Sequence, residues 1–478
     1  LDPLPDIDFN IRCGNTLVGY ASEKEVLDDS TYSDFFTGNE FKKKMEVEMT
    51  KVAKVYEHFR RIQLSQHEDM AEFKEAKEEL HTRLSTFTEQ LNQQMFSRQL
   101  GGEEFKQEEY EAYLASHQPF HWFAEYYQII HGNGGFDVII GNPPYVEYSK
   151  VKKFYTLENY TTLACGNLYA FVIERSFVLG KKYLGYIVPS ASIATPRMKQ
   201  LSSFMLSHGG LWSSIWDERP SKLFDGVDQQ LAIHILYLDE VKKYYITQMR
   251  HWSASARDTL FNSINYQVYL RSDILTGVCP KVGSLLEMSI IRKISQADTL
   301  FSVVYDPNSG TLIYYKNAGG RYWRQVKSYP TYFNSQKGQS SSTELAFSVQ
   351  SKYKALVVCA LSSSMFYLYW RVISNCRHLT SREFDVFRIP SVLKESKEIK
   401  SLHQRFEKSL EANKKRTTTV NKSTGETTQD FYYLKLSKRI IDEIDKVLAK
   451  HYDFTEEELD FIINYDIKYR MGDELNEN

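Results

Sequence analysis

The feature that most constrains the fold is an apolar run that ends in two consecutive prolines. Residues 136–141 read Phe-Asp-Val-Ile-Ile-Gly, and residues 142–145 read Asn-Pro-Pro-Tyr. A short, continuous apolar run bounded by turn residues is typical of a strand buried on both faces of a parallel sheet. Proline fixes φ and lacks the backbone N–H, so the strand must end near Asn142. We therefore expect these four residues at the carboxyl end of a buried strand, where open α/β sheets bind their ligands.

The residues after this strand continue an alternation of helices and strands. The pattern predicts a helix at 168–179, a strand at 183–188, a helix at 197–207 and a strand at 231–238. Such alternation indicates a doubly wound α/β sheet. Upstream, residues 10–17 are typical of a short strand that runs into a turn.

Residues 22–118 differ in character from the α/β part. Phe41–Leu64 and Met70–Phe96 contain no proline, are rich in Glu, Lys, Gln and Leu, and place apolar residues at helical spacing. We expect two long helices that form an antiparallel hairpin, with charged faces in solvent.

The C-terminal half is mixed. Short Tyr- and Val-rich segments predict strands at Phe301–Tyr305, Leu312–Tyr315 and Arg321–Val326. The last eighty or so residues are expected to be helical, with helices at Leu434–Tyr452 and Glu456–Tyr465, apart from a flexible polar loop at Ala412–Thr428.

Charge and cysteine usage narrow the class of protein. The overall charge is −2, but residues 241–395 contain 20 Lys and Arg against 9 Asp and Glu, a net charge of +11. Such asymmetry favours a nucleic-acid partner for this segment, although an acidic protein or plain solvation would also suit it. The five cysteines are scattered and the apolar runs are too short for a membrane span. We expect a cytoplasmic protein with no membrane association.

The Asn-Pro-Pro-Tyr motif suits methylation of an exocyclic amine. The lone pair of such an amine is delocalised into the ring, so acceptors must engage its N–H groups while the nitrogen becomes tetrahedral. The side-chain oxygen of Asn142, a proline carbonyl and the ring of Tyr145 provide two acceptors and a stacking surface. A rigid turn after a strand would explain the prolines equally well, but not the preceding apolar run together with the flanking residues.

Residues 136–145 resemble the catalytic motif of the gamma-class, Taq-type DNA adenine methyltransferases, in particular their larger relatives among type IIG restriction-modification enzymes. Further segments resemble those of the family in the same order along the chain: Cys13–Leu17, Pro119–Phe123, Asn167–Phe171, Gly185–Ser190 and Lys222–Val227. The resemblance implies a bacterial, Rossmann-like enzyme that uses S-adenosylmethionine and extrudes the target adenine from double-stranded DNA.

The resemblance also implies roles for single residues. Asn142 would accept from the target amine, Pro143 would supply the second acceptor and Pro144 would hold the turn. Tyr145 would stack on the extruded base, with Phe224 at its edge or on its other face. No general base is nominated, because the proton can leave after methyl transfer.

The cofactor side of the resemblance is incomplete. Asn15, Thr16 and Leu17, together with Asn142, would contact S-adenosylmethionine, and Asn15 stands where the family has an acidic residue. The family's Gly-containing loop does not occur ahead of these residues. We therefore expect a Rossmann-like sheet that lacks its N-terminal half, in a longer polypeptide whose missing N-terminal portion carries this loop and possibly a nuclease domain. This chain alone is expected to bind the cofactor weakly and to be inactive.

The resemblance divides the chain into four regions. They are the methyltransferase domain (1–20 and 119–245), a helical insertion (21–118), a mixed α/β target-recognition domain (246–395) and a C-terminal helical region (396–478). The basic residues expected to contact DNA lie in the third region: Arg321, Arg324, Lys327, Arg371 and Arg377.

Two other functions fit part of the pattern. The chain could be a DNA-binding specificity module without activity of its own, or an RNA or protein-glutamine methyltransferase, because those enzymes also use Asn-Pro-Pro-Tyr. A metal site is not expected. The histidines lack a metal-binding spacing, and the Asp-x-x-Glu-x-Lys string at 69–74 lies in an expected helix rather than on the strand that a nuclease site needs.

Overall fold

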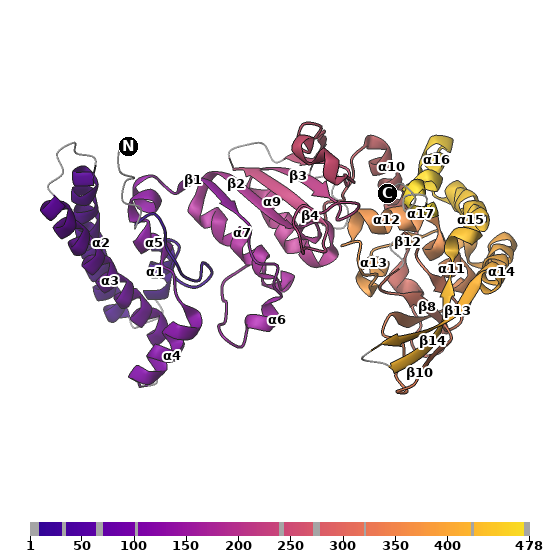
Figure 1. Cartoon of the computed structure of the whole chain (residues 1–478), viewed down its shortest axis with the longest axis horizontal. Helices are drawn as coiled ribbons and strands as arrows, with labels where there is room; N and C mark the ends of the chain where they lie inside the picture. The colour runs from indigo at the N-terminus through magenta and orange to yellow at the C-terminus, as the bar shows by residue number, and fades with distance from the viewer. Residues whose placement is uncertain are drawn as a thin grey trace. The chain divides into compact units, whose positions relative to one another are not determined.

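The computed structural model describes residues 9–30, 35–63, 70–100, 104–238, 243–270, 278–319, 322–421 and 425–472 (Figure 1). The chain divides into two compact units. Unit 1 comprises Leu1–Val188, Ser207–Leu211 and Ile233–Val241, and unit 2 comprises Pro189–Leu206, Trp212–Ala232 and Lys242–Asn478.

A six-stranded sheet has the strand order β1-β2-β4-β3-β5-β6. The strands are β1 (Phe136–Gly141), β2 (Gly180–Pro189), β3 (Gly210–Trp216), β4 (Leu231–Tyr237), β5 (Lys243–Ile246) and β6 (Gln267–Leu270). β1 pairs with β2 in parallel, and β5 pairs with β6 antiparallel. The expected α/β alternation is confirmed by β1, α7 (Leu168–Leu179), β2, α9 (Lys199–His208) and β4. β3, β5 and β6 were not anticipated.

The expectation that β1 is buried on both faces is wrong. Val138 is 52% exposed and Ile140 is 83% exposed, whereas Ile139 between them is partly buried. Successive side chains of a strand point to opposite faces, so one face of β1 is open within the described part of the chain. β1 stands first in the strand order and has a described neighbour on one side, β2.

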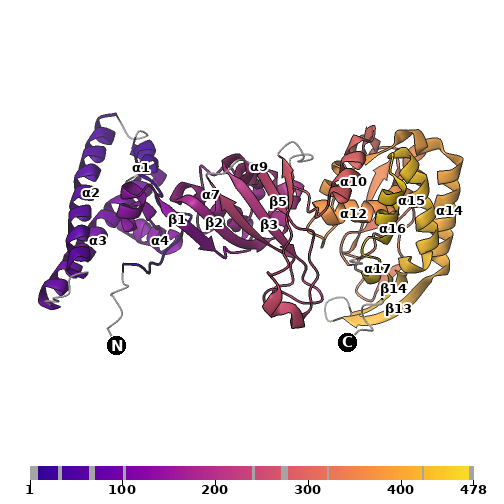
Figure 2. The ribbon, with the colours of Figure 1, turned by 90° about the horizontal axis from the view of Figure 1, so that it is seen from above.

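The two long helices of unit 1 are present as expected. α2 (Phe35–Gln63) and α3 (Met70–Leu100) lie side by side (Figures 1 and 2). Their shared core contains Met45, Met49, Val52, Phe59, Leu80, Leu84, Phe87 and Leu91. The strand expected at residues 10–17 is not observed. A turn takes its place, in which the Val18 N–H donates to the Asn15 carbonyl at 3.0 Å.

Within its described residues, unit 2 contains a helical core and three small sheets, in the orders β10-β14-β13, β11-β8-β9 and β12-β7. The strands are β7 (Thr299–Leu300), β8 (Thr311–Lys316), β9 (Val326–Lys327), β10 (Phe333–Ser335), β11 (Glu344–Val349), β12 (Arg388–Ile389), β13 (Lys414–Asn421) and β14 (Gly425–Tyr432). Its core helices include α11 (Lys354–Ser362), α12 (Ser364–Ile373), α14 (Lys397–Ala412), α15 (Lys438–His451) and α16 (Glu456–Asn464). The helices expected at 434–452 and 456–465 and the strand at 312–315 are confirmed, the last as β8 (Thr311–Lys316).

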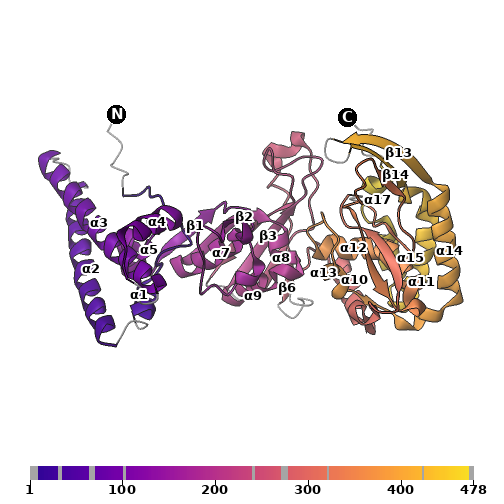
Figure 3. The ribbon, with the colours of Figure 1, turned by 90° about the horizontal axis from the view of Figure 1, so that it is seen from below.

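Three predictions of secondary structure in unit 2 are wrong. Residues 301–304 form a 3₁₀ turn rather than a strand, because Phe301 and Val304 are both buried at a spacing of three. Most of 321–326 is not a strand. β9 covers Val326–Lys327, and Arg321 lies outside the described residues. The expected loop at 412–428 is mostly the hairpin of β13 (Lys414–Asn421) and β14 (Gly425–Tyr432), shown in Figure 3.

Within the described ranges, no single helix is long and apolar enough to cross a membrane. One pair bent by 68°, Ser351–Ser362 with Ser364–Ile373, reaches that length and composition only when its halves are taken together.

Candidate active site and the loop of Phe224

The Asn-Pro-Pro-Tyr motif begins directly after β1, at the carboxyl end of a parallel strand. Asn142 and Pro144 are exposed, Pro143 is buried and Tyr145 is partly buried. Residues 142–146 have no regular structure, which leaves the backbone carbonyls of the motif outside any helix. The position expected for Asn142-Pro143-Pro144-Tyr145 is therefore confirmed.

The hydroxyl of Tyr145 connects the motif to β2. It lies 2.9 Å from Oδ1 of Asn142 and 2.9 Å from the carbonyl oxygen of Ile187. A phenol has one proton, so it can donate fully to only one of these acceptors at a time. Burial raises the pKa of Tyr145 to about 12, so the hydroxyl keeps that proton at neutral pH. When it donates to Ile187, Oδ1 of Asn142 is available to another donor.

The chain that leaves the motif is attached to the start of α7. The Leu168 N–H donates to the Val146 carbonyl at 2.9 Å, and the amide of Asn167 donates to Oε1 of Glu147 at 3.3 Å. Asn167 is the N-cap residue of α7, yet its side chain does not cap that helix. The side chain of an Asn at the N-cap normally accepts a backbone N–H of the first helical turn. Here the Asn167 side chain instead contacts Glu147, just after the Asn-Pro-Pro-Tyr motif.

The residues expected to hold S-adenosylmethionine at 15–17 are engaged by the protein itself. Oδ1 of Asn15 accepts from the Leu17 N–H at 3.2 Å, and the hydroxyl of Thr16 accepts from the Trp122 indole at 3.2 Å. The Leu17 carbonyl accepts from the Tyr160 hydroxyl at 3.0 Å. Asn15, Thr16 and Leu17 therefore do not present a set of free polar groups to this cofactor, and Asn142 alone of the four has an exposed side chain.

Phe224 lies in unit 2, on an irregular loop between β3 and β4. Its side chain is 37% exposed. The Val227 N–H donates to the Phe224 carbonyl at 3.3 Å and closes a turn in which Gly226 has φ of 78°. This left-handed conformation favours glycine, so residues 224–227 form a turn with Phe224 at its start.

Three of the five basic residues expected to contact DNA are buried. Arg324 is 3% exposed and lies 3.8 Å over the ring of Trp370. Lys327 is 0% exposed and pairs with Glu344 at 3.0 Å. Arg371 is likewise buried, as described below, so these three positions do not support the expected role. Arg377 is exposed, and Arg321 lies outside the described residues.

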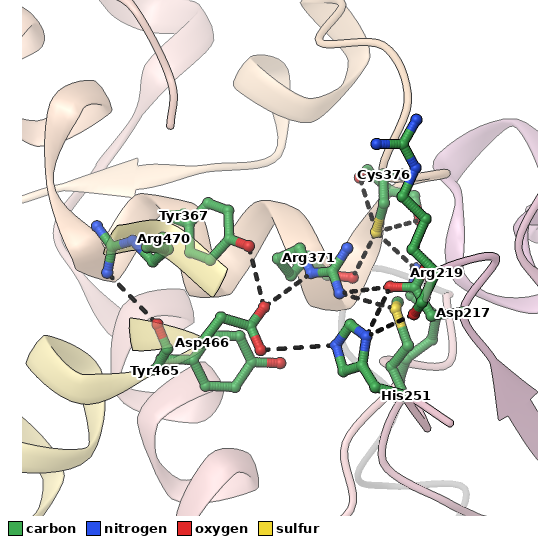
Figure 4. A network of polar contacts seen from close by, with 12 residues as sticks. Asp217, Arg219, His251, Tyr367, Arg371, Cys376, Tyr465, Asp466 and Arg470 are labelled. Carbon is green, nitrogen blue, oxygen red and sulfur yellow. Dashed lines mark hydrogen bonds and ion pairs between the residues drawn. The ribbon is translucent and has the colours of Figure 1, made fainter. Parts of the chain in front are cut away.

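Arg371 belongs to a polar network that the sequence did not reveal (Figure 4). Its Nη2 lies 3.1 Å from Oδ2 of Asp217, and its Nε lies 3.3 Å from Oδ2 of Asp466. His251 faces the same two carboxylates at 3.5 Å and 3.8 Å. Burial opposes ionisation of Asp466, but Arg371 and His251 outweigh it and hold the pKa of this carboxyl below its usual value.

Neither the histidines nor the acidic residues of the described ranges form a cluster that could hold a metal ion. His121 is 1% exposed. It accepts from the Tyr20 N–H at 3.2 Å and contacts Oδ1 of Asn92 at 2.9 Å. Burial lowers its pKa to about 3, so it remains neutral.

The mixed α/β sheet, with Asn-Pro-Pro-Tyr at the end of β1, is consistent with the Rossmann-like fold of a methylase domain. Residues 41–224 match the family model of the Eco57I restriction-modification methylases. The matched segment contains β1, the motif, α7 and β2, and it ends at Phe224. None of the curated proteins matches this chain. The chain thus contains a segment similar to restriction-modification methylases, a class of enzymes that transfer methyl groups to DNA.

Proposed function

We propose that this protein methylates the exocyclic amine of adenine at a specific site in double-stranded DNA, with S-adenosylmethionine as methyl donor, as part of a type IIG restriction-modification enzyme. One observation carries the proposal. Asn142 and Tyr145 stand together at the carboxyl end of β1, within the segment that matches the Eco57I methylase family.

The geometry of the motif suits an amine that carries two N–H groups. Oδ1 of Asn142 accepts one N–H once the Tyr145 hydroxyl donates to Ile187, and the Pro143 carbonyl accepts the other. The acceptors draw the hydrogens out of the ring plane and raise the electron density on nitrogen. The ring of Tyr145, held through its hydroxyl, offers a face on which the extruded base can stack.

The methyl donor is the finer part of the proposal. S-adenosylmethionine supplies the methyl group in this class of reaction, and an exposed Asn142 side chain can face it as well as the base. Residues 15–17 form hydrogen bonds with Gln118, Trp122 and Tyr160. We therefore assign them no role in binding S-adenosylmethionine.

Methylome sequencing tests the proposal directly. Cells that express the protein in full are expected to carry methyladenine at one discrete DNA sequence, and the Asn142→Ala variant is expected to lose this mark. Asn133→Ala is the matched control, because Asn133 is an exposed asparagine that precedes the same strand and should leave the mark intact.

Other outcomes would redirect the assignment. Methyladenine that persists in the Asn142→Ala variant would overturn the role of the motif. DNA binding at a specific sequence without methylation by the unmodified protein would indicate a specificity module. Methyl transfer to RNA or to a protein glutamine, with unmarked DNA, would overturn the choice of substrate.

A further inference from the structure

The turn that carries Phe224 is held on both sides by arginine side chains. Before the turn, Arg257 donates through Nη2 to the Leu223 carbonyl at 3.1 Å and through Nη1 to the Lys222 carbonyl at 3.4 Å. After the turn, Arg377 donates through Nη1 to the Asp228 carbonyl at 3.1 Å. Both contacts go to backbone, so they fix the path of the loop rather than the side chains on it.

The two arginines are themselves positioned. Arg257 lies over the ring of Trp252 at 5.7 Å. The N–H groups of Arg377 and His378 both donate to Oδ1 of Asn375, at 2.9 Å and 3.0 Å, in the turn that follows α12. The loop is therefore anchored to the 3₁₀ segment Ala254–Thr259 and to the irregular segment that follows α12.

The beginning of the loop is attached to the same part of unit 2. Asp217, the first residue after β3, pairs with Arg371 on α12. Nδ1 of His251 lies 3.1 Å from the Arg219 carbonyl and 3.5 Å from Asp217. Figure 4 shows these residues together. Arg371 on α12 and Arg377, which follows α12, thus contact the two ends of the segment that presents Phe224.

A second feature keeps the turn closed. Lys222 and Asp228 form an ion pair across its base. The hydrogen bond from Lys222 and its charge hold the pKa of the exposed Asp228 below its usual value, so Asp228 is ionised at neutral pH. Phe224 itself stays 37% exposed, with its ring available to a partner.

We infer that Arg257 and Arg377 are positioning residues that order the Phe224 turn in unit 2 and hold its exposed ring ready to stack on a base. This inference rests on the proposed function. Both residues lie in the segment 246–395 expected to recognise DNA, so this segment also fixes the path of the Phe224 loop. An aromatic side chain held in place before binding does not lose loop entropy when the base arrives.

The contacts of Arg257 and Arg377 with the loop differ in whether a lysine could replace the arginine. Arg257 spans two neighbouring carbonyls with the planar fork of its guanidinium, which a lysine cannot reproduce. Arg377 makes a single contact to the loop, which a lysine ammonium can replace. Arg377→Lys should therefore restore what Arg377→Ala removes, whereas Arg257→Lys should not restore what Arg257→Ala removes.

The test compares Arg257→Ala, Arg377→Ala, the double variant and the two lysine variants in the full protein. Arg382→Ala is the matched control, since Arg382 is exposed on α13 (Ser381–Asp385) beyond these anchors. Three quantities are measured: hydrogen exchange of the amides at 218–229, affinity for DNA containing the methylated sequence, and the single-turnover methylation rate at saturating DNA.

We expect the double variant to exchange loop amides about tenfold faster and to methylate about tenfold more slowly, with DNA affinity changed less than about threefold. Unchanged loop exchange would overturn the inference. So would a loss of DNA affinity with an unchanged saturated rate, because the arginines would then contact DNA directly. If the unmodified protein methylates no DNA, the proposed function fails, and loop exchange still decides whether the arginines order the turn.

Discussion

Replacing Arg371 by Met should destabilise unit 2 strongly. The guanidinium of Arg371 is 1% exposed and faces Asp217 at 3.1 Å and Asp466 at 3.3 Å, with side chains that are 0% and 13% exposed. Arg371→Met keeps most of the side-chain volume but leaves these carboxylates without their guanidinium. Removing one partner of a buried ion pair costs about 3–5 kcal/mol, and we expect a loss of unfolding free energy in this range at pH 7.

Urea denaturation followed by tryptophan fluorescence measures this loss. Of the six tryptophans, Trp122 lies in unit 1 and the other five lie in unit 2, so the signal reports mainly on unit 2. Arg382→Met is the control. Arg382 is exposed on α13, and its replacement should change the unfolding free energy by less than about 0.5 kcal/mol.

The pH dependence provides a second check of the same reasoning. The folded pKa of Asp466 is held below its usual value. A carboxyl of this kind contributes stability above its unfolded pKa and loses it as the pH falls through the folded pKa. The difference between the unmodified protein and Arg371→Met should therefore narrow below about pH 4. A loss under about 1 kcal/mol at pH 7, or a difference that does not narrow in acid, would refute the argument.

Three further outcomes are expected. Burial raises the pKa of Glu287 to about 7, so Glu287→Gln should be more stable than the unmodified protein by about 1–3 kcal/mol at pH 8, with the difference gone by about pH 4 in urea titrations. A variant that is not more stable at pH 8 would contradict the raised pKa. Tyr145→Phe keeps the ring but loses the hydroxyl contacts to Asn142 and Ile187, and should slow single-turnover methylation about tenfold without weakening DNA binding. An unchanged methylation rate would show that the Tyr145 hydroxyl has no role in the reaction. Isothermal titration of S-adenosylmethionine into residues 1–478 should show weak or no binding, and micromolar affinity would disprove this.

The sequence predicted the helices and strands around the Asn-Pro-Pro-Tyr motif well, because the local apolar pattern there determines the type of element. The short apolar run before Asn142 predicted a strand, the two prolines set its end, and α7 follows at the expected residues. The burial of that strand could not be predicted in the same way. The apolar composition of β1 indicates that both faces suit a core, but exposure depends on which elements lie beside the strand. Val138 and Ile140 are open although their sequence is that of an interior strand.

The hairpin at 414–432 shows the opposite error. A run of Lys, Arg and Thr was interpreted as a flexible loop because it contains few apolar residues. In the structure the two strands are joined by polar cross-strand contacts, a hydroxyl pair between Thr418 and Thr428 at 2.9 Å and a bidentate pair between Arg416 and Asp430. Threonine is a good strand former, and opposite charges across a ladder stabilise it. Polar composition alone therefore did not distinguish a loop from an edge hairpin.

A count of charges along the sequence conceals why three of the basic residues expected to contact DNA are buried. The net charge of +11 over 241–395 includes Arg371, but its partners Asp217 and Asp466 lie before and after that segment in the sequence. A positive window can thus be neutral in space, and a buried arginine needs acids that the chain brings from far away. A surface that binds DNA must instead be sought among exposed cations. Arg377 is one of these, and its contact with the Phe224 loop shows that even exposure does not by itself assign a cation to a phosphate.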